Sequence, residues 1–122
     1  MTAQKNIYQE VLLRHWRFPQ NFGKIHKPTK SVVSYNAVCG DKIQMDVVLE
    51  KDRLKAIKFS GQGCVISMAC ASLLTEYVKG KRITSMKKID RDFILKMLGI
   101  QISPSRLKCA LLPLETLHKV IS

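Results

Sequence analysis

The stretch that decides the fold is residues 42–64, KIQMDVVLEKDRLKAIKFSGQGC. Hydrophobic and polar side chains alternate over residues 42–50, which predicts a strand with one buried face. The side chains expected on that face are Ile43, Met45, Val47 and Leu49. Residues 51–53 are predicted to form a hairpin turn, and residues 54–60 the next strand. A weaker pattern over residues 31–38 predicts a third antiparallel strand.

Helical patterns lie on both sides of these strands. Residues 6–17 predict a short amphipathic helix that stops before Pro19, because the residue preceding a proline disfavours helical backbone. After the Gly61-Gln62-Gly63 turn, the pattern predicts a helix that continues through Val78 and ends at Gly80.

Two more helices are expected near the C-terminus. One is predicted within residues 85–98, ending before Gly99, and another begins with Ser103 as N-cap and Pro104 at its first position. Pro113 is expected to kink or divide that last helix, since it lacks an N–H and clashes with the preceding turn. Strands followed by helices predict one α+β domain over residues 1–122, with a three-stranded antiparallel sheet packed against several helices.

Composition and charge narrow the function classes. The 122 residues carry a net charge of +12, but the basic residues are spread along the chain without a run or tail. We therefore do not expect a nucleic-acid partner, and favour an acidic protein or an anionic cluster. No apolar run approaches the ~20 residues of a membrane span, and residues 1–10 lack the apolar core of a secretory signal. These patterns predict a cytoplasmic protein.

Four cysteines occur, at positions 39, 64, 70 and 109. In a reducing compartment they are expected as free thiols that bind metal, catalyse or pack in the core. No pair has the C-x-x-C spacing of zinc fingers or thioredoxins. Cys70 is about 240° around a helix from Cys64, at ~100° per residue, and is predicted to be a core residue.

The local context of the other three cysteines indicates a metal site. Cys39 begins a Cys-Gly-Asp turn, Cys64 follows Gly-x-Gly and opens a helix, and Cys109 lies near the start of another helix. A thiol at a helix N-terminus favours the thiolate that binds metal or attacks sulfur. Asp41 could supply a fourth ligand, and three thiolates with one carboxylate suit Zn²⁺ or iron. The alternative is that these thiols are inert core groups and Asp41 a turn residue.

Four stretches together resemble the U-type iron–sulfur scaffold family, which comprises IscU, SufU and the N-terminal domains of NifU proteins. They are residues 8–23, residues 35–43 with Y-N-A-V-C-G-D-K-I, residues 59–79 with the run G-Q-G-C-V-I-S-M-A-C-A-S, and residues 104–110 with P-S-R-L-K-C-A. They follow one another in the family's order and cover nearly the whole chain.

The resemblance implies a function and a set of site residues. Cys39, Cys64 and Cys109 would be the sulfur ligands and Asp41 the exchangeable acidic ligand of a [2Fe–2S] cluster or of iron. A cysteine desulfurase would deliver persulfide sulfur, with Cys109 or Cys64 as its acceptor, and apoproteins would receive the finished cluster. The resemblance therefore implies a scaffold and carrier rather than an enzyme.

Two departures from the better-known subtype leave alternatives open. Lys108 stands where that subtype has histidine, and S-P-S-R-L-K replaces its proline-rich chaperone-recognition stretch, so we do not expect dependence on an Hsp70-type chaperone. The segment Arg106–Cys109 is more similar to SufU, which implies the alternative of a zinc-bound persulfide acceptor with sulfurtransferase activity. A more distant alternative is a basic, zinc-stabilised module that binds nucleic acid.

Overall fold

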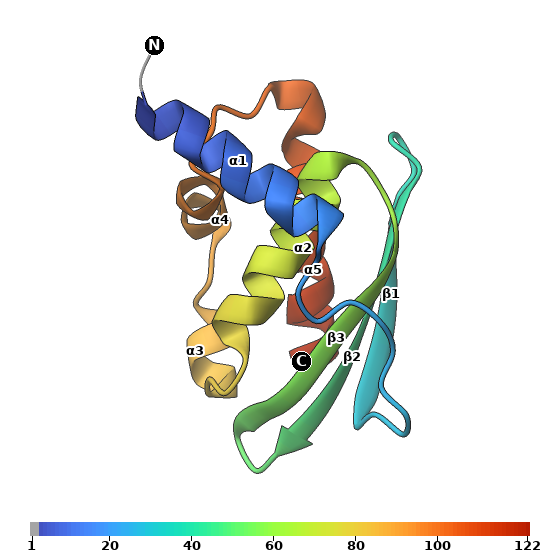
Figure 1. Ribbon diagram of the computed structural model, residues 1–122. Helices are drawn as coiled ribbons and strands as arrows, with labels where there is room; N and C mark the ends of the chain where they lie inside the picture. Colours follow the sequence, from blue (N-terminus) through green and yellow to red (C-terminus); the bar gives the residue numbers. More distant parts are fainter. Residues whose placement is uncertain (1–2) are drawn as a thin grey trace.

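The strands form one antiparallel sheet in the order β1-β2-β3 in the computed structural model, which describes residues 3–122 and side chains from residue 7 onward. They are β1 (Lys30–Asn36), β2 (Asp41–Glu50) and β3 (Arg53–Gln62). Two-residue and four-residue turns connect consecutive strands, so the sheet is a simple meander (Figure 1). The α+β class and the three-stranded antiparallel sheet predicted from the sequence are confirmed.

Alternation along β2 decides which face of the sheet is buried. Ile43, Met45 and Val47 have no exposed surface, as their spacing predicts. Leu49 is an exception and is only partly buried, because the pairing of β2 with β3 shifts register between Val48 and Leu49. An irregularity of this kind interrupts the strict two-residue alternation on which the prediction for Leu49 depended.

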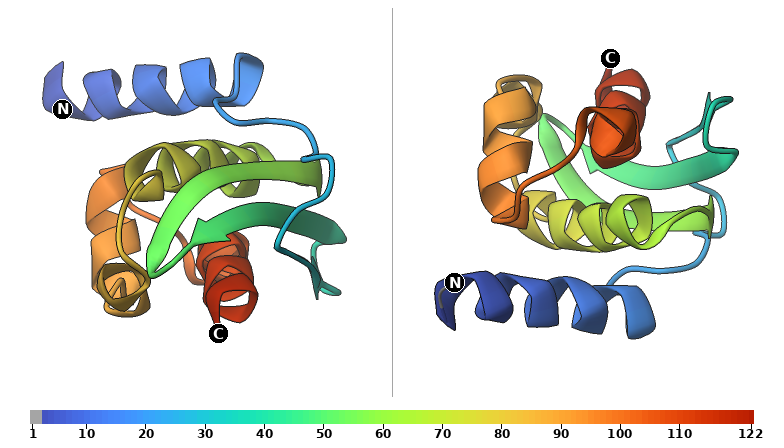
Figure 2. Two further views of the ribbon diagram at one scale, coloured as in Figure 1. Left: turned by 90° about the horizontal axis from the view of Figure 1, so that it is seen from below. Right: turned by 90° about the horizontal axis from the view of Figure 1, so that it is seen from above.

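Helices cover one face of the sheet in a second layer. The helix α2 (Val65–Val78) packs against β3, and α5 (Leu107–Ile121) packs against β1 and β2. The helix α1 (Ala3–Arg17) lies across α2, further from the sheet (Figures 1 and 2). It begins before the predicted residue 6 and ends, as predicted, before Pro19. The long α2 likewise ends before Gly80, which has a positive φ of 85°.

The region between α2 and α5 contains two helices where one was predicted. They are α3 (Ile83–Lys87) and α4 (Arg91–Leu98), and the carboxylate of Asp90 accepts a hydrogen bond from Phe93 N at 2.9 Å at the start of α4. This capping bond begins a new helix after Ile89, so the expected segment 85–98 is interrupted. The helix α4 ends before Gly99, as predicted, and Gly99 has the left-handed φ of 68°.

The last helix is preceded by a short 3₁₀ turn, η1 (Pro104–Arg106). Ser103 is the N-cap residue of this turn and Pro104 its first residue, as predicted, although the Ser103 side chain makes no capping hydrogen bond. The helix α5 runs from Leu107 to Ile121 through Pro113, which does not divide it. Pro113 is buried, and the packing of α5 on the sheet and on α2 holds both halves in one helix.

The connection from α1 to β1 makes backbone hydrogen bonds to the free edge of β3 and then contacts a side chain of β2. Gly23 N donates to Phe59 O at 2.8 Å, and Phe59 N donates to Asn21 O at 2.9 Å. The connection next meets Asp46, which is 3 % exposed although the alternation predicted a solvent-facing position. The Asp46 carboxylate accepts from Ile25 N at 3.0 Å, Ser31 Oγ at 2.5 Å and Gln44 Nε2 at 3.0 Å.

Burial acts to raise the pKa of Asp46, but its hydrogen bonds and the charge of Lys24 outweigh that effect. The pKa therefore lies below its ordinary value of 3.8, which favours the ionised carboxylate. Asp46 thus acts as a charged anchor that joins the connecting segment to the sheet.

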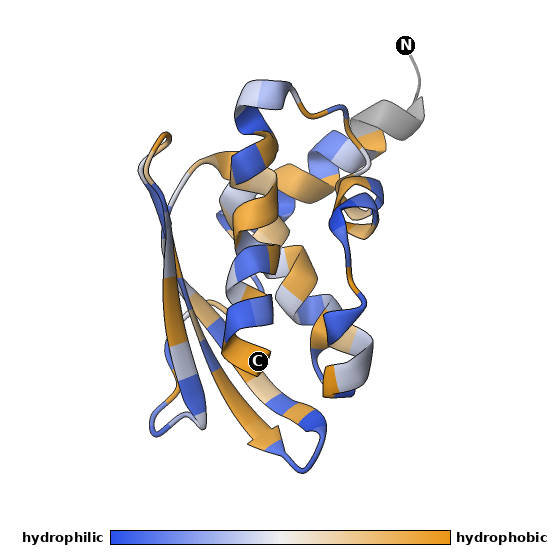
Figure 3. Cartoon of the chain, turned by 180° about the vertical axis from the view of Figure 1, so that it is seen from behind, coloured by the Kyte–Doolittle hydropathy of each residue, from blue (hydrophilic) through white to orange (hydrophobic). Residues whose placement is uncertain are grey.

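Hydrophobic and hydrophilic segments follow one another along the strands and helices (Figure 3). Most elements therefore have one side toward the core and another toward solvent. The helix α2 is the exception, because it packs against α1, α5 and β3 and has no exposed residue over positions 65–75. Within residues 3–122, no helix combines the length and hydrophobicity that crossing a membrane requires.

Candidate metal centre

Three segments far apart in the sequence meet at one end of the molecule, the upper end in Figure 1. They are the turn between β1 and β2, the connection from β3 to α2, and the start of α5. These segments carry the four residues that the sequence singles out, and an open pocket of about 500 Å³ lies among them. The pocket is lined by Cys39, Gly40, Asp41, Gln62, Gly63, Cys64, Arg106 and Cys109.

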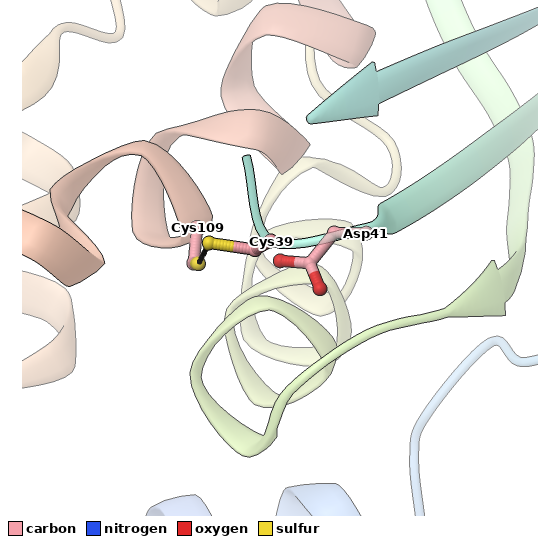
Figure 4. Close-up of side chains that lie close together, drawn as sticks. All are labelled: Cys39, Asp41 and Cys109. Carbon is pink, nitrogen blue, oxygen red and sulfur yellow. Dashed lines mark hydrogen bonds between the residues drawn. The ribbon is translucent and has the colours of Figure 1, made fainter. Parts of the chain in front are cut away.

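Cys39, Asp41 and Cys109 form the tightest group in this pocket. One ligand atom from each can be chosen so that all three lie within 4.8 Å of one another. The Cys109 thiol donates a hydrogen bond to Cys39 Sγ at 3.0 Å, and the Asp41 carboxylate lies beside the pair (Figure 4). Two atoms bound to one zinc ion at about 2.0–2.3 Å are at most roughly 4.6 Å apart, so this group requires little movement to hold a metal.

Cys64 adjoins the group through Asp41. It is the N-cap residue of α2, with φ −74° and ψ 171°, and makes no side-chain capping bond. Its backbone N–H donates to Asp41 Oδ1 at 3.2 Å, and its Sγ lies 4.0 Å from Asp41 Oδ2. Asp41 therefore links the turn between β1 and β2, residues 37–40 and below called the ligand loop, to the start of α2. Its Oδ1 lies toward Cys64 N and its Oδ2 toward Cys64 Sγ.

The two glycines before Cys64 permit this approach. Gly61 has a φ of 133°, and a Cβ there would lie 2.0 Å from Lys42 O, so the chain turns where other residues cannot. At Gly63, a Cβ would lie 2.3 Å from Ser67 Oγ and 3.0 Å from Asp41 Oδ1. A side chain at position 63 would thus displace the carboxylate from Cys64.

The three cysteines differ in exposure. Cys39 is exposed, Cys64 is half-buried and Cys109 is buried. Burial, with smaller contributions from hydrogen bonds to Cys39 and Asp41, raises the pKa of the Cys109 thiol far above its ordinary value. The Cys109 proton is therefore retained until a cation replaces it, and binding a metal must release it.

Two residues that the sequence analysis did not single out contact the cysteine sulfurs from behind. Asn36 Nδ2 lies 3.8 Å from Cys109 Sγ, and Ser67 Oγ lies 3.8 Å from Cys64 Sγ. A signal for Asn36 existed, because an asparagine in a turn commonly bonds backbone two residues later, which here is Val38 in the ligand loop. Ser67 lies in the run after Gly-x-Gly-Cys, but nothing local distinguishes it from a core serine.

Cys70 lies apart from the pocket, as predicted. It has no exposed surface, and its Sγ donates to Ala110 O at 3.2 Å in α5. Burial raises its pKa to about 12, so the thiol stays neutral.

The donor set decides which metals the pocket fits. Three soft sulfurs and one carboxylate oxygen suit Zn²⁺ or iron, and four ligands satisfy a tetrahedral ion. Asp41 is the harder donor, and two of the residues that line this open pocket, Cys39 and Arg106, are exposed. The arrangement can therefore hold a metal or small cluster and leave it accessible from outside.

Comparisons with known proteins find relatives over nearly the whole chain. Residues 7–122 match the family model of the NifU-like N-terminal domain. The zinc-dependent sulfurtransferase SufU of Bacillus subtilis is 34 % identical over 133 aligned residues, covering 95 % of this chain and 90 % of that protein. The iron–sulfur cluster assembly scaffold protein IscU 1 of Archaeoglobus fulgidus is 31 % identical, covering 94 % of this chain and 74 % of that protein.

A solved structure supports the same relationship. The crystal structure of an iron–sulfur cluster assembly scaffold protein for the SUF system, from Fervidobacterium islandicum, superposes with a TM-score of 0.82 at 27 % identity. The superposition covers 96 % of this chain and 98 % of that one. Sequence and fold agree over nearly the full length, and the chain belongs to the family of NifU-like N-terminal domains.

Proposed function

We propose that this chain is an iron–sulfur cluster assembly scaffold. It receives sulfur from a cysteine desulfurase, builds a [2Fe–2S] cluster on Cys39, Asp41, Cys64 and Cys109, and transfers the cluster to apoproteins in the cytoplasm. The observation that carries this proposal is the meeting of three thiols and one carboxylate from three distant segments in one open pocket. The scaffold role of IscU and SufU relatives supports it.

Sulfur enters by thiolate exchange. A cysteine thiolate attacks the outer sulfur of the desulfurase persulfide, a new S–S bond forms, and the bond within the donor persulfide breaks to release the desulfurase thiolate. Among the three thiols, the exposed Cys39 is the most accessible to such a donor, followed by the half-buried Cys64. Cys109 is buried, and it can accept sulfur only after the ligand loop moves.

A second candidate function uses the same residues. In it, the four residues hold Zn²⁺ and the chain accepts persulfide sulfur as a sulfurtransferase that activates the desulfurase. Zinc would keep its thiol ligands ionised at neutral pH. Lys108 in place of the histidine of other scaffolds, and the similarity to SufU of B. subtilis, favour this alternative.

Asp41 is the residue proposed to let the cargo leave. Its carboxylate is the one hard donor in a set of thiols, and hard oxygen ligands bind iron less firmly than thiolates do. Acceptor thiolates that enter the open pocket lined by Asp41 can therefore replace this ligand first. A nucleic-acid partner and an Hsp70-type chaperone are not part of the proposal.

One experiment separates the two candidates. The purified protein is analysed for metal, then reconstituted anaerobically with ferrous iron, cysteine, a desulfurase and a dithiol that reduces persulfide sulfur to sulfide, and followed by absorbance. Iron and sulfide in equal amounts, with charge-transfer bands that decay when apo-ferredoxin is added, support the scaffold. Tightly held zinc that iron cannot replace, together with faster desulfurase turnover, supports the zinc-dependent sulfur acceptor. A protein that binds neither overturns both.

A further inference from the structure

Asn36 is a buried polar residue at the point where β1 ends and the ligand loop begins. It is 7 % exposed, and it pairs with Asp41 in the register of β1 and β2. Its backbone carbonyl accepts from Gly40 N at 2.8 Å, which closes the turn that presents Cys39. Asn36 therefore stands directly behind the ligand loop.

The side chain of Asn36 is held at both ends. Its Oδ1 accepts from Val38 N at 3.2 Å, and its Nδ2 lies 3.8 Å from Cys109 Sγ. The bond with Val38 decides the orientation of the amide, because only an oxygen can accept from a backbone N–H. The amide N–H₂ group consequently points at the Cys109 sulfur rather than away from it.

Cys109 has a particular need for such a donor. It is buried, so water cannot solvate the negative charge that its sulfur acquires when metal replaces the proton. An N–H group aimed at a thiolate stabilises that charge, and partners behind metal ligands fix their orientation and tune the metal. Cys39, by contrast, is exposed and can be solvated by water.

We propose that Asn36 is a positioning residue that donates its side-chain N–H to the Cys109 thiolate, and so orients and stabilises this ligand in the loaded site. This inference rests on the proposed function, in which Cys109 binds metal. A purely structural role is the competing explanation: Asn36 would only hold the ligand loop through Val38. The two roles use different atoms of one amide, so substitutions can separate them.

The experiment uses Co²⁺ as the probe on the full chain. Wild type is compared with Asn36→Asp, which keeps an oxygen for Val38 N but has no N–H for the sulfur, and with Asn36→Ala, which loses both. Asn21→Asp is the matched control, because Asn21 donates through Nδ2 to Thr75 Oγ1 at 3.2 Å, away from the pocket. The readouts are Co²⁺ affinity, the sulfur-to-cobalt charge-transfer bands and the melting temperature of the metal-free protein.

Both Asn36 variants are expected to bind Co²⁺ about 10- to 100-fold more weakly. Their charge-transfer bands should move to longer wavelength, because a sulfur that loses a hydrogen bond gives up its electrons more easily. Only Asn36→Ala should lower the melting temperature of the metal-free protein, and Asn21→Asp should leave the bands unchanged. If Asn36→Asp keeps wild-type affinity and bands, the loop role alone is right and the proposal is overturned.

A direct measurement on wild type covers the case in which the variants do not fold. With ¹¹³Cd bound, a hydrogen bond from Asn36 to a cadmium-bound sulfur should produce scalar coupling between the metal and the Asn36 side-chain amide proton. Clear coupling of cadmium to the cysteine protons with none to Asn36 overturns the proposal while leaving the metal site intact. Failure of wild type to bind Co²⁺ or Cd²⁺ overturns the metal site itself, and the Asn36 role with it.

Discussion

The pocket end of the molecule and the core behind it each bury one cysteine and one aspartate, but the neighbours of these residues differ between the two regions. Cys109 and Asp41 line the pocket, whereas Cys70 and Asp46 lie away from it. Both aspartates belong to β2. Burial does not distinguish the pairs. Both cysteines have no exposed surface, and both aspartates are 3 % exposed.

The two regions differ in how many hydrogen bonds the neighbouring residues make to these buried side chains. Asp46 accepts hydrogen bonds from three different residues, and Cys70 donates to a backbone carbonyl. The Asp41 carboxylate, by contrast, has only thiols and the backbone N–H of Cys64 as neighbouring donors among the described residues, and Cys109 faces a second thiol. A buried polar group whose hydrogen bonds are all made stabilises the fold. Thiols and a carboxylate that face one another keep lone pairs without a hydrogen-bond partner, and these lone pairs can bind a cation.

The largest difference is expected in metal binding by the two cysteines. Cys109→Ala removes one of four ligands, roughly a quarter of the about 10–16 kcal/mol typical of a structural zinc site, so affinity should fall about 100- to 1,000-fold. Cys70→Ala should leave affinity within about 3-fold and lower stability by roughly 1–2 kcal/mol through the lost packing. Competition titration with a chromophoric chelator measures both. Loss of metal in Cys70→Ala would show that Cys70 belongs to the site.

The aspartates should differ in the opposite sense, in the stability of the metal-free protein. Asp46→Ala leaves donors from three residues without their acceptor and should lower the free energy of unfolding by about 3 kcal/mol. Asp41→Ala removes one backbone bond and should cost about 1 kcal/mol or less. Urea unfolding with a chelator present checks this. Equal losses would contradict the distinction between the two carboxylates.

The contribution of Asp46 to stability should also depend on pH. Because its pKa is lower in the folded protein than in the unfolded chain, its stabilising contribution is complete above the unfolded pKa and is lost as pH falls through the folded pKa. Wild type should therefore lose stability from about pH 5 downward. The difference in slope from Asp46→Asn should approach, and not exceed, about 1.4 kcal/mol per pH unit. Parallel stability curves for the two proteins between pH 5 and 3 would contradict this assignment.

The smallest effect is expected on the lifetime of a bound cluster. Asp41→Ala removes the exchangeable oxygen ligand, so transfer to an apo-ferredoxin should slow by about 2- to 5-fold, equivalent to about 0.4–1 kcal/mol in the barrier. Decay of the charge-transfer absorbance after addition of acceptor measures the rate. Asp46→Asn serves as control and should transfer at the wild-type rate. An equal or shorter lifetime in Asp41→Ala would refute the release role of Asp41.

Much of the fold was predictable because its signals are local. The alternation over residues 42–50 predicts β2, and Pro19, Gly80 and Gly99 mark helix ends through their own backbone preferences. The split between α3 and α4 was missed, although Asp90 could have indicated it, because the capping bond to Phe93 is a local signal. Pro113 misled in the other direction, since tertiary packing overrode its tendency to break a helix.

The sequence by itself determined the identity of the candidate ligands. Cys39 and Asp41 lie in one turn, Cys64 follows two glycines that open a helix, and Cys109 begins another, so local geometry already predicts four donors at element ends. Only the tertiary structure decided that Cys39 is exposed and Cys109 buried, and that Asn36 points at the Cys109 sulfur. Residue type and spacing determine backbone conformation nearby, whereas burial and hydrogen-bond partners depend on which distant segments pack against a residue.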